Sequence, residues 1–96
     1  MYKEITKEQE EEIKKLFTNS RSIDFSFKNK EDGYYITISQ MYDYCTFKGD
    51  MSVLRGYLAI ADILGCTEGD ELSKHSLDGC ETCDYGSSYT TELRFW

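Results

Sequence analysis

Two cysteines spaced for metal or redox chemistry stand near the end of this 96-residue chain, at Cys80 and Cys83. A Cys-x-x-Cys turn lets two thiolates reach one Zn²⁺ ion, and a structural zinc site needs four ligands. Cys45 or Cys66 would have to supply further ligands, or His75 would replace one of them. Because those two cysteines do not form a second such pair, a zinc-stabilised domain is an alternative to a plain turn with partly buried thiols.

Catalysis is not favoured by the residue types or their spacing. A redox pair belongs at the start of a helix, where the helix dipole lowers the thiol pKa, but a glycine-serine segment, residues 86–88, follows these cysteines. His75 is the only histidine, with no serine or cysteine at a spacing that suggests a triad. No phosphate loop, dinucleotide glycine pattern or metalloprotease helix motif is present. We therefore expect no enzyme activity and no cofactor, with zinc as the alternative.

The net charge of −7 is concentrated in the last third of the chain. Residues 66–96 hold seven acids and two bases, whereas residues 1–65 hold eleven acids and nine bases. Such a field repels nucleic acid and anionic membranes and attracts a basic protein surface. A solvated acidic surface that keeps the chain soluble is the simpler interpretation of the same residues.

The composition is that of one folded domain spanning residues 1–96, with 40% hydrophobic and 15% aromatic residues. The N-terminal residues hold no apolar signal segment, and no apolar run is long enough to span a membrane. We therefore expect a cytoplasmic protein without a membrane partner, whose four cysteines are reduced thiols or metal ligands.

Two helices are predicted. The first begins at Thr6, where a capping box with Gln9 satisfies free amides of the first turn, and ends at residues 19–20. The second begins at Asp50 or Ser52 and ends at Gly65. Helical spacing makes it the central core helix, with a broad apolar stripe formed by Val53, Leu54, Tyr57, Leu58, Ile60, Ala61, Ile63 and Leu64.

Strands are predicted between and after these helices. Strict alternation of apolar and polar residues marks a strand over residues 22–28, and a polar turn leads into a second over residues 34–39. A third strand follows over residues 41–47, after a break near residues 39–40. Residues 66–79 are predicted to form an exposed loop with a short strand at 71–76. The side chains of residues 89–96 alternate in the pattern of a final strand. The predicted fold is α+β: a helix, a three-stranded antiparallel meander, a core helix and a C-terminal strand that closes the sheet.

A protein-binding surface is predicted from the acidic and tyrosine residues. Tyr42 and Tyr44 would form a rigid amphipathic patch, for which ordinary cross-strand packing is the alternative. Stacking of nucleic acid on these rings is disfavoured because basic residues do not accompany them. The acidic members are Glu68, Asp70, Glu71, Asp78, Glu81 and Asp84, with Tyr85 at their edge.

The sequence GCETCDYGSSYTTELRFW at the end of the chain resembles the C-terminal tails of small uncharacterised phage and prophage proteins of Gram-positive bacteria. The acidity and the order of helix, three strands and helix resemble some small phage anti-CRISPR proteins. The first resemblance implies a phage-encoded accessory protein that binds and inhibits a host or defence protein. We expect such a chain to cover a basic, nucleic-acid-binding surface of its partner. A homodimer is an alternative form of association.

A third class of function is a module that sequesters a nucleotide or another small molecule. It would need a basic or aromatic pocket, and the arginines that could line one are scattered along the chain at Arg21, Arg55 and Arg94.

Overall fold

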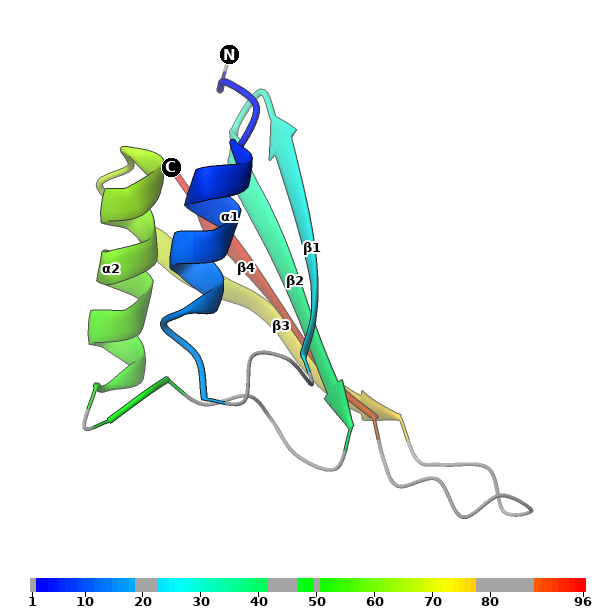
Figure 1. Cartoon of the computed structure of the whole chain (residues 1–96). Coiled ribbons are helices and arrows are strands. Elements are labelled where there is room, and N and C mark those ends of the chain that lie inside the picture. The colour runs from blue at the N-terminus through cyan, green and yellow to red at the C-terminus, as the bar shows by residue number, and fades with distance from the viewer. Residues whose placement is uncertain (1, 19–22, 42–46, 50, 78–87) are drawn as a thin grey trace.

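The computed structural model describes residues 2–18, 23–41, 47–49, 51–77 and 88–96 (Figure 1). The elements follow in the order α1 (Lys7–Lys14), β1 (Ile23–Lys30), β2 (Gly33–Met41), α2 (Val53–Leu64), β3 (Gly69–Leu77) and β4 (Ser88–Phe95). The strands form one antiparallel sheet in the order β1-β2-β4-β3. The predicted α+β class is confirmed.

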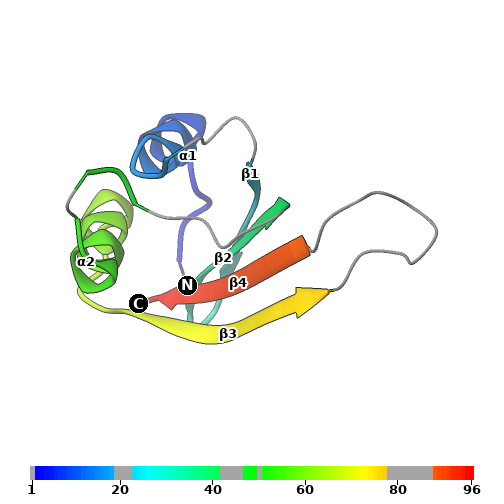
Figure 2. The same ribbon diagram turned by 90° about the horizontal axis from the view of Figure 1, so that it is seen from below.

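The chain repeats one arrangement, a helix followed by two antiparallel strands. The first half is α1, β1 and β2, and the second half is α2, β3 and β4. The second strands of the two halves, β2 and β4, pair at the centre, so the C-terminal strand joins the two halves in one sheet. Both helices cover the same face of this sheet, as the end-on view shows (Figure 2).

The first helix begins as predicted and ends earlier than predicted. The Thr6 hydroxyl accepts from the amide of Gln9 at 3.1 Å, and the Gln9 side chain accepts from the amide of Thr6 at 2.9 Å. The helix ends at Lys14 because the chain tightens there, with the amide of Phe17 donating to the carbonyl of Lys14. Phe17 then pairs with Phe47 in an isolated β-bridge, which is incompatible with further helix.

The second strand runs through the break that the sequence predicts near residues 39–40. β2 continues to Met41 because β4 pairs with it from Tyr34 to Met41, including Ser39 with Thr90. Of the predicted third strand over residues 41–47, Met41 therefore belongs to β2. Phe47 forms the bridge to Phe17, and residues 42–46 lie outside the described part of the chain.

A nine-residue strand, β3, replaces the predicted loop with its short strand at residues 71–76. Its register on β4 shifts between Glu71 and Ser73, so Leu72 has no Cα partner on β4. The sequence shows no period of two here because the bulge breaks the alternation. The five β3 residues from Asp70 to Lys74 are all exposed, which removes the apolar signal of a half-buried strand.

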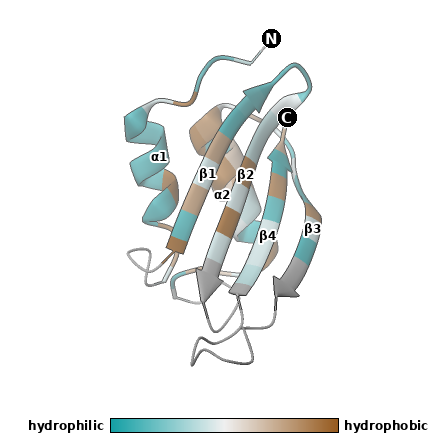
Figure 3. Ribbon diagram, turned by 90° about the vertical axis from the view of Figure 1, so that its right-hand side faces the viewer, coloured by the Kyte–Doolittle hydropathy of each residue, from teal (hydrophilic) through white to brown (hydrophobic). Residues whose placement is uncertain are grey.

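The core lies between the helices and one face of the sheet. Its centre comes from the alternating residues of the two middle strands, Ile36 and Ile38 in β2 and Leu93 and Phe95 in β4. Figure 3 shows the helices behind the sheet, with α1 mostly hydrophilic and α2 largely hydrophobic. The remaining buried hydrophobic residues are Ile13, Phe17, Ile23, Tyr34, Ile60, Ala61 and Leu64.

The predicted apolar stripe of α2 is only partly buried. The helix begins with Ser52 as its N-cap and ends at Gly65 with a φ of 74°, as predicted. Ile60, Ala61 and Leu64 are buried, but the other five residues of the stripe are not. Val53, Leu54 and Leu58 are 58%, 66% and 49% exposed. Neither described helix is long and apolar enough to cross a membrane.

Candidate functional site

Three of the predicted binding residues lie together at the β3 edge of the sheet, where no described strand pairs with the outer side of β3. Glu68 precedes β3, and Asp70 and Glu71 lie in its first three residues, all of them exposed. The carbonyl of Trp96 accepts from the amides of Thr67 and Glu68, each at 3.0 Å, which fixes the start of this edge on β4. The other predicted members lie outside the described residues: Tyr42, Tyr44, Asp78, Glu81, Asp84 and Tyr85.

The bulge in β3 decides which side chains lie on which face of the edge strand. Without it, Lys74 would lie on the face opposite to Glu71, because residues three apart in a regular strand point to opposite faces. The shifted register instead places Glu71 opposite Leu93 and Lys74 opposite Thr91, both of which point toward the helices. The two charged groups approach to 4.0 Å as a result.

Exposed apolar side chains flank this edge. Gly56 of α2 faces the ring of Phe47, which stacks on Phe17 just after the end of α1. Leu54 and Leu58 each stand two residues from Gly56, which is about 200° around a helix. They therefore lie on the flank of α2 away from the ring of Phe47. Leu72 of β3, the strand that follows α2, is also 46% exposed.

These residues together form what we call the edge surface. Its apolar members were not predicted as binding residues, because the sequence assigned Leu54 and Leu58 to the core. A signal was available: the apolar stripe of α2 covers more of the helix circumference than one sheet face can bury. The edge surface consists of Leu54, Leu58, Glu68, Asp70, Glu71 and Leu72.

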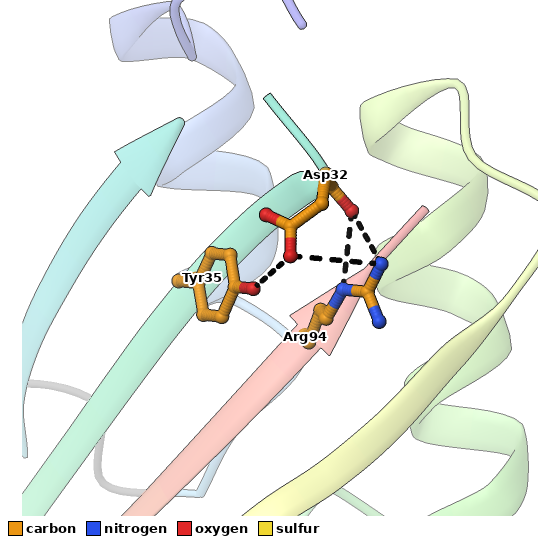
Figure 4. Close-up of polar contacts among 3 residues, drawn as sticks. All are labelled: Asp32, Tyr35 and Arg94. Atoms are coloured by element: carbon orange, nitrogen blue, oxygen red, sulfur yellow. Dashed lines mark hydrogen bonds and ion pairs between the residues drawn. The ribbon is translucent and has the colours of Figure 1, made fainter. Parts of the chain in front are cut away.

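The opposite face of the sheet, which no described helix covers, holds a polar cluster of Asp32, Tyr35 and Arg94 (Figure 4). The hydroxyl of Tyr35 donates to Oδ2 of Asp32 at 2.8 Å. The guanidinium of Arg94 donates to the carbonyl of Asp32 through Nη2 at 2.6 Å and Nε at 3.1 Å. Lys30 lies over the ring of Tyr35 at 4.3 Å, and Arg94 lies over the ring of Trp96 at 4.5 Å.

This cluster holds the turn between β1 and β2 against β4. The hydrogen bond from Tyr35 lowers the pKa of Asp32, and Arg94 adds a smaller effect in the same direction. The same bond raises the pKa of Tyr35, so its proton stays on the phenol. A tyrosine that acts as a base or nucleophile needs the opposite shift. The hydrogen bonds of Tyr35 and Arg94 to Asp32 tie the turn to β2 and β4.

Of the predicted metal ligands, only Cys66 has a described position. It is half-buried just after α2, packs against the core, and burial raises the pKa of its thiol. Within the described ranges, no group of three or more metal-ligating side chains comes together. Cys45, Cys80 and Cys83 lie outside those ranges, as does the side chain of His75, so the zinc hypothesis stays a prediction.

A cavity of about 970 Å³ opens between α2 and the helix-facing side of the sheet. Phe17 and Phe47, whose rings stack at 4.5 Å, line one side of it, and Leu93 and Thr91 of β4 line another. The cavity reaches the ion pair between Glu71 and Lys74 on β3.

Comparison of this chain with protein-family models, with curated proteins and with solved structures found no match.

Proposed function

We propose that this chain is a protein-binding module whose edge surface takes up an extended basic segment of a partner protein. The observation that carries the proposal is the exposure of three leucines beside an edge strand with acidic residues. An unpaired strand edge offers backbone donors and acceptors to another chain. Exposed apolar side chains next to such an edge are typical of interaction sites.

The apolar part of the surface supplies binding free energy. Leu54, Leu58 and Leu72 keep about half or more of their surface in contact with solvent. Covering each one would contribute on the order of 1 kcal/mol, since full burial of a leucine is worth roughly 1.5–3 kcal/mol. Side chains that alternate along a bound strand could contact these leucines with every second residue.

The negative charge of the edge surface favours a positively charged segment of the partner. Glu68, Asp70 and Glu71 are exposed along seven residues in which Lys74 is the one base. The whole chain carries a net charge of −7. A basic segment is therefore attracted, and its association should weaken as salt screens the charges.

The resemblance of the C-terminal tail to phage proteins supports a more specific form of the same proposal. In that form, the partner is a host or defence protein, and the bound segment belongs to its nucleic-acid-binding surface. Covering such a surface with an acidic edge would compete with nucleic acid for the same basic residues. The chain would then inhibit its partner by occupying that surface, without reacting with it.

The proposal is tested by capture from a Gram-positive bacterial lysate with matched baits. The test bait carries E68K/D70K/E71K, and the control bait carries E4K/E12K/E31K, which changes the net charge equally at three exposed acids away from β3. A protein captured by the wild type and the control, and lost with the test bait, is then purified. We expect its affinity to fall at least tenfold with E68K/D70K/E71K and to fall with rising salt.

The leucines give a second arm with no change of charge. L54S/L58S should weaken the same purified complex, while thermal unfolding of the free chain stays close to that of the wild type. Equal loss of binding with both charge variants would overturn the edge surface as the site. Self-association of the chain that E68K/D70K/E71K abolishes would assign the edge to a second copy instead.

A further inference from the structure

The cavity between α2 and the sheet has the size and lining of a small-molecule site. Its volume of about 970 Å³ lies within the range of ligand pockets, which is roughly 300–1,000 Å³. Its apolar wall is contributed by both layers of the fold, with Phe17, Phe47, Val53 and Tyr57 from the helical side and Ile38 and Leu93 from the sheet.

One polar side chain inside the cavity has no hydrogen-bond partner in the part of the chain that the structure describes. Thr91 is 7% exposed, lines the cavity, and lies between Ile38 and Lys74 in the helix-facing row of the sheet. Its hydroxyl makes no hydrogen bond with any described residue, although the neighbouring Thr90 hydroxyl is bonded to that of Ser39 at 3.2 Å. A buried hydroxyl without a partner is unfavourable, so Thr91 indicates a ligand with a group that bonds to it.

The charges at the cavity favour neither an anionic nor a cationic ligand. Glu71 and Lys74 are 4.0 Å apart and neutralise each other. Asp70 also lines the cavity, but its register partner on β4 is Arg94, which lies on the face of the sheet away from the helices. Arg94 lies on the opposite face of the sheet, and Arg55 is exposed and does not line the cavity. A charged head group would lose its hydration here without gaining an unpaired counter-charge.

We propose that this cavity binds a small uncharged molecule with a flat apolar body and one hydrogen-bonding group. The body lies against the rings of Phe17, Phe47 and Tyr57, and its polar group pairs with the hydroxyl of Thr91. The cavity shares Asp70 and Glu71 with the edge surface, but the ligand contacts proposed here do not involve those two side chains and do not depend on binding at that surface.

Two fluorescent probes with the same aromatic body test the proposal. N-phenyl-1-naphthylamine is neutral and has one N–H, and 8-anilino-1-naphthalenesulfonate adds a sulfonate to that body. We expect the neutral probe to bind saturably at one site per chain, with the sulfonated probe at least tenfold weaker. Binding of the sulfonated probe with equal or greater affinity would overturn the uncharged class of ligand.

Two exposed residues in the first turn of α2 supply the matched variants. Val53 lines the cavity and is 58% exposed, whereas Arg55 is exposed and does not line it. V53W should fill the entrance and weaken the neutral probe at least tenfold, and R55W should leave its affinity unchanged. Because both side chains are exposed, both variants are expected to fold. Absence of saturable binding to the wild type, or equal binding by V53W and R55W, would overturn the site.

The variant T91V distinguishes a role of the Thr91 hydroxyl in ligand binding from a role in the fold. It keeps the shape of the side chain and removes the hydroxyl. Loss of one hydrogen bond to the ligand predicts roughly fivefold weaker binding of the neutral probe. In the free chain, T91V should raise the melting temperature, because it removes a buried polar group without a partner. A lower melting temperature with unchanged probe affinity would show that the hydroxyl serves the fold and would overturn its role in binding.

Discussion

The side chain of Tyr35 holds Asp32 by a 2.8 Å hydrogen bond across the two-residue turn between β1 and β2. Arg94 of β4 binds the carbonyl of the same aspartate, although 62 residues separate the two in sequence. One exposed turn is therefore fixed by its own hairpin and by the strand that joins the two halves of the chain.

The bond between Tyr35 and Asp32 makes stability depend on acid pH. The folded-state pKa of Asp32 is below its unfolded value, so this contribution is complete at neutral pH and is lost as pH falls through the folded pKa. Y35F should raise the pKa of Asp32 toward its ordinary value of about 3.9. NMR titration of the Asp32 carboxyl in both proteins measures the shift. D24N, which removes an exposed carboxylate of β1, is the control for the effect of losing one charge on stability. An unchanged Asp32 titration in Y35F would contradict the prediction.

The packing of Gly56 against Phe47 predicts that a methyl group at this position destabilises the fold. Alanine usually stabilises a helix relative to glycine by about 1 kcal/mol, but a Cβ at Gly56 would overlap the ring of Phe47. That ring cannot move freely because it stacks on Phe17 at 4.5 Å. We expect G56A to lower the free energy of unfolding by about 1–3 kcal/mol in urea denaturation. D62A, at an exposed position of α2, should change it by less than about 0.5 kcal/mol, and a gain in stability for G56A would contradict the packing.

The leucines of the sheet and of α2 should separate into two classes on truncation. Leu93 is 1% exposed, and L93A should cost about 2–5 kcal/mol of stability. Leu58 is 49% exposed, and L58A should cost less than about 0.5 kcal/mol. Urea denaturation of the two variants measures both values. Similar costs would show that Leu58 belongs to the core, as the sequence alone suggests.

The capping box at the start of α1 predicts a smaller, local effect. T6A removes the acceptor for the amide of Gln9 and should lower stability by about 1 kcal/mol. K7A, at the next exposed position, keeps the cap and should be close to neutral. Hydrogen exchange of the α1 amides shows whether the loss is confined to this helix. No change in T6A would mean that α1 is held by packing of Ile13 alone.

The predictable parts of the fold are those with a local signal. The capping box of Thr6, the alternation in β1 and the C-terminal glycine of α2 each depend on neighbouring residues, and the structure confirms them. β3 was predicted only as a short strand at residues 71–76 within a loop, because a bulge and its exposed position erase the alternation on which strand prediction depends. Its place at the edge follows from β4 pairing with β2, which no local pattern reveals.

Of the candidate site, only the acidic residues could be predicted from the sequence. The acids at Glu68, Asp70 and Glu71 stand out in the sequence, and the structure places them at one edge. Exposure of Leu54 and Leu58 was not predictable, because helical spacing shows that residues share a face but does not show how much of it a neighbour covers. The partnerless hydroxyl of Thr91 depends on which groups lie around it in space, and a strand pattern carries no such information.

The central pairing of β2 with β4 has a consequence for how the chain folds. Each hairpin closes over a short stretch of sequence, but Ile36 meets Leu93 only after 57 residues of separation. Closing that long loop costs conformational entropy before the core contacts compensate for it. We therefore expect the docking of the two halves to limit the folding rate, and mutations at the β2–β4 seam to slow folding more than mutations within either hairpin.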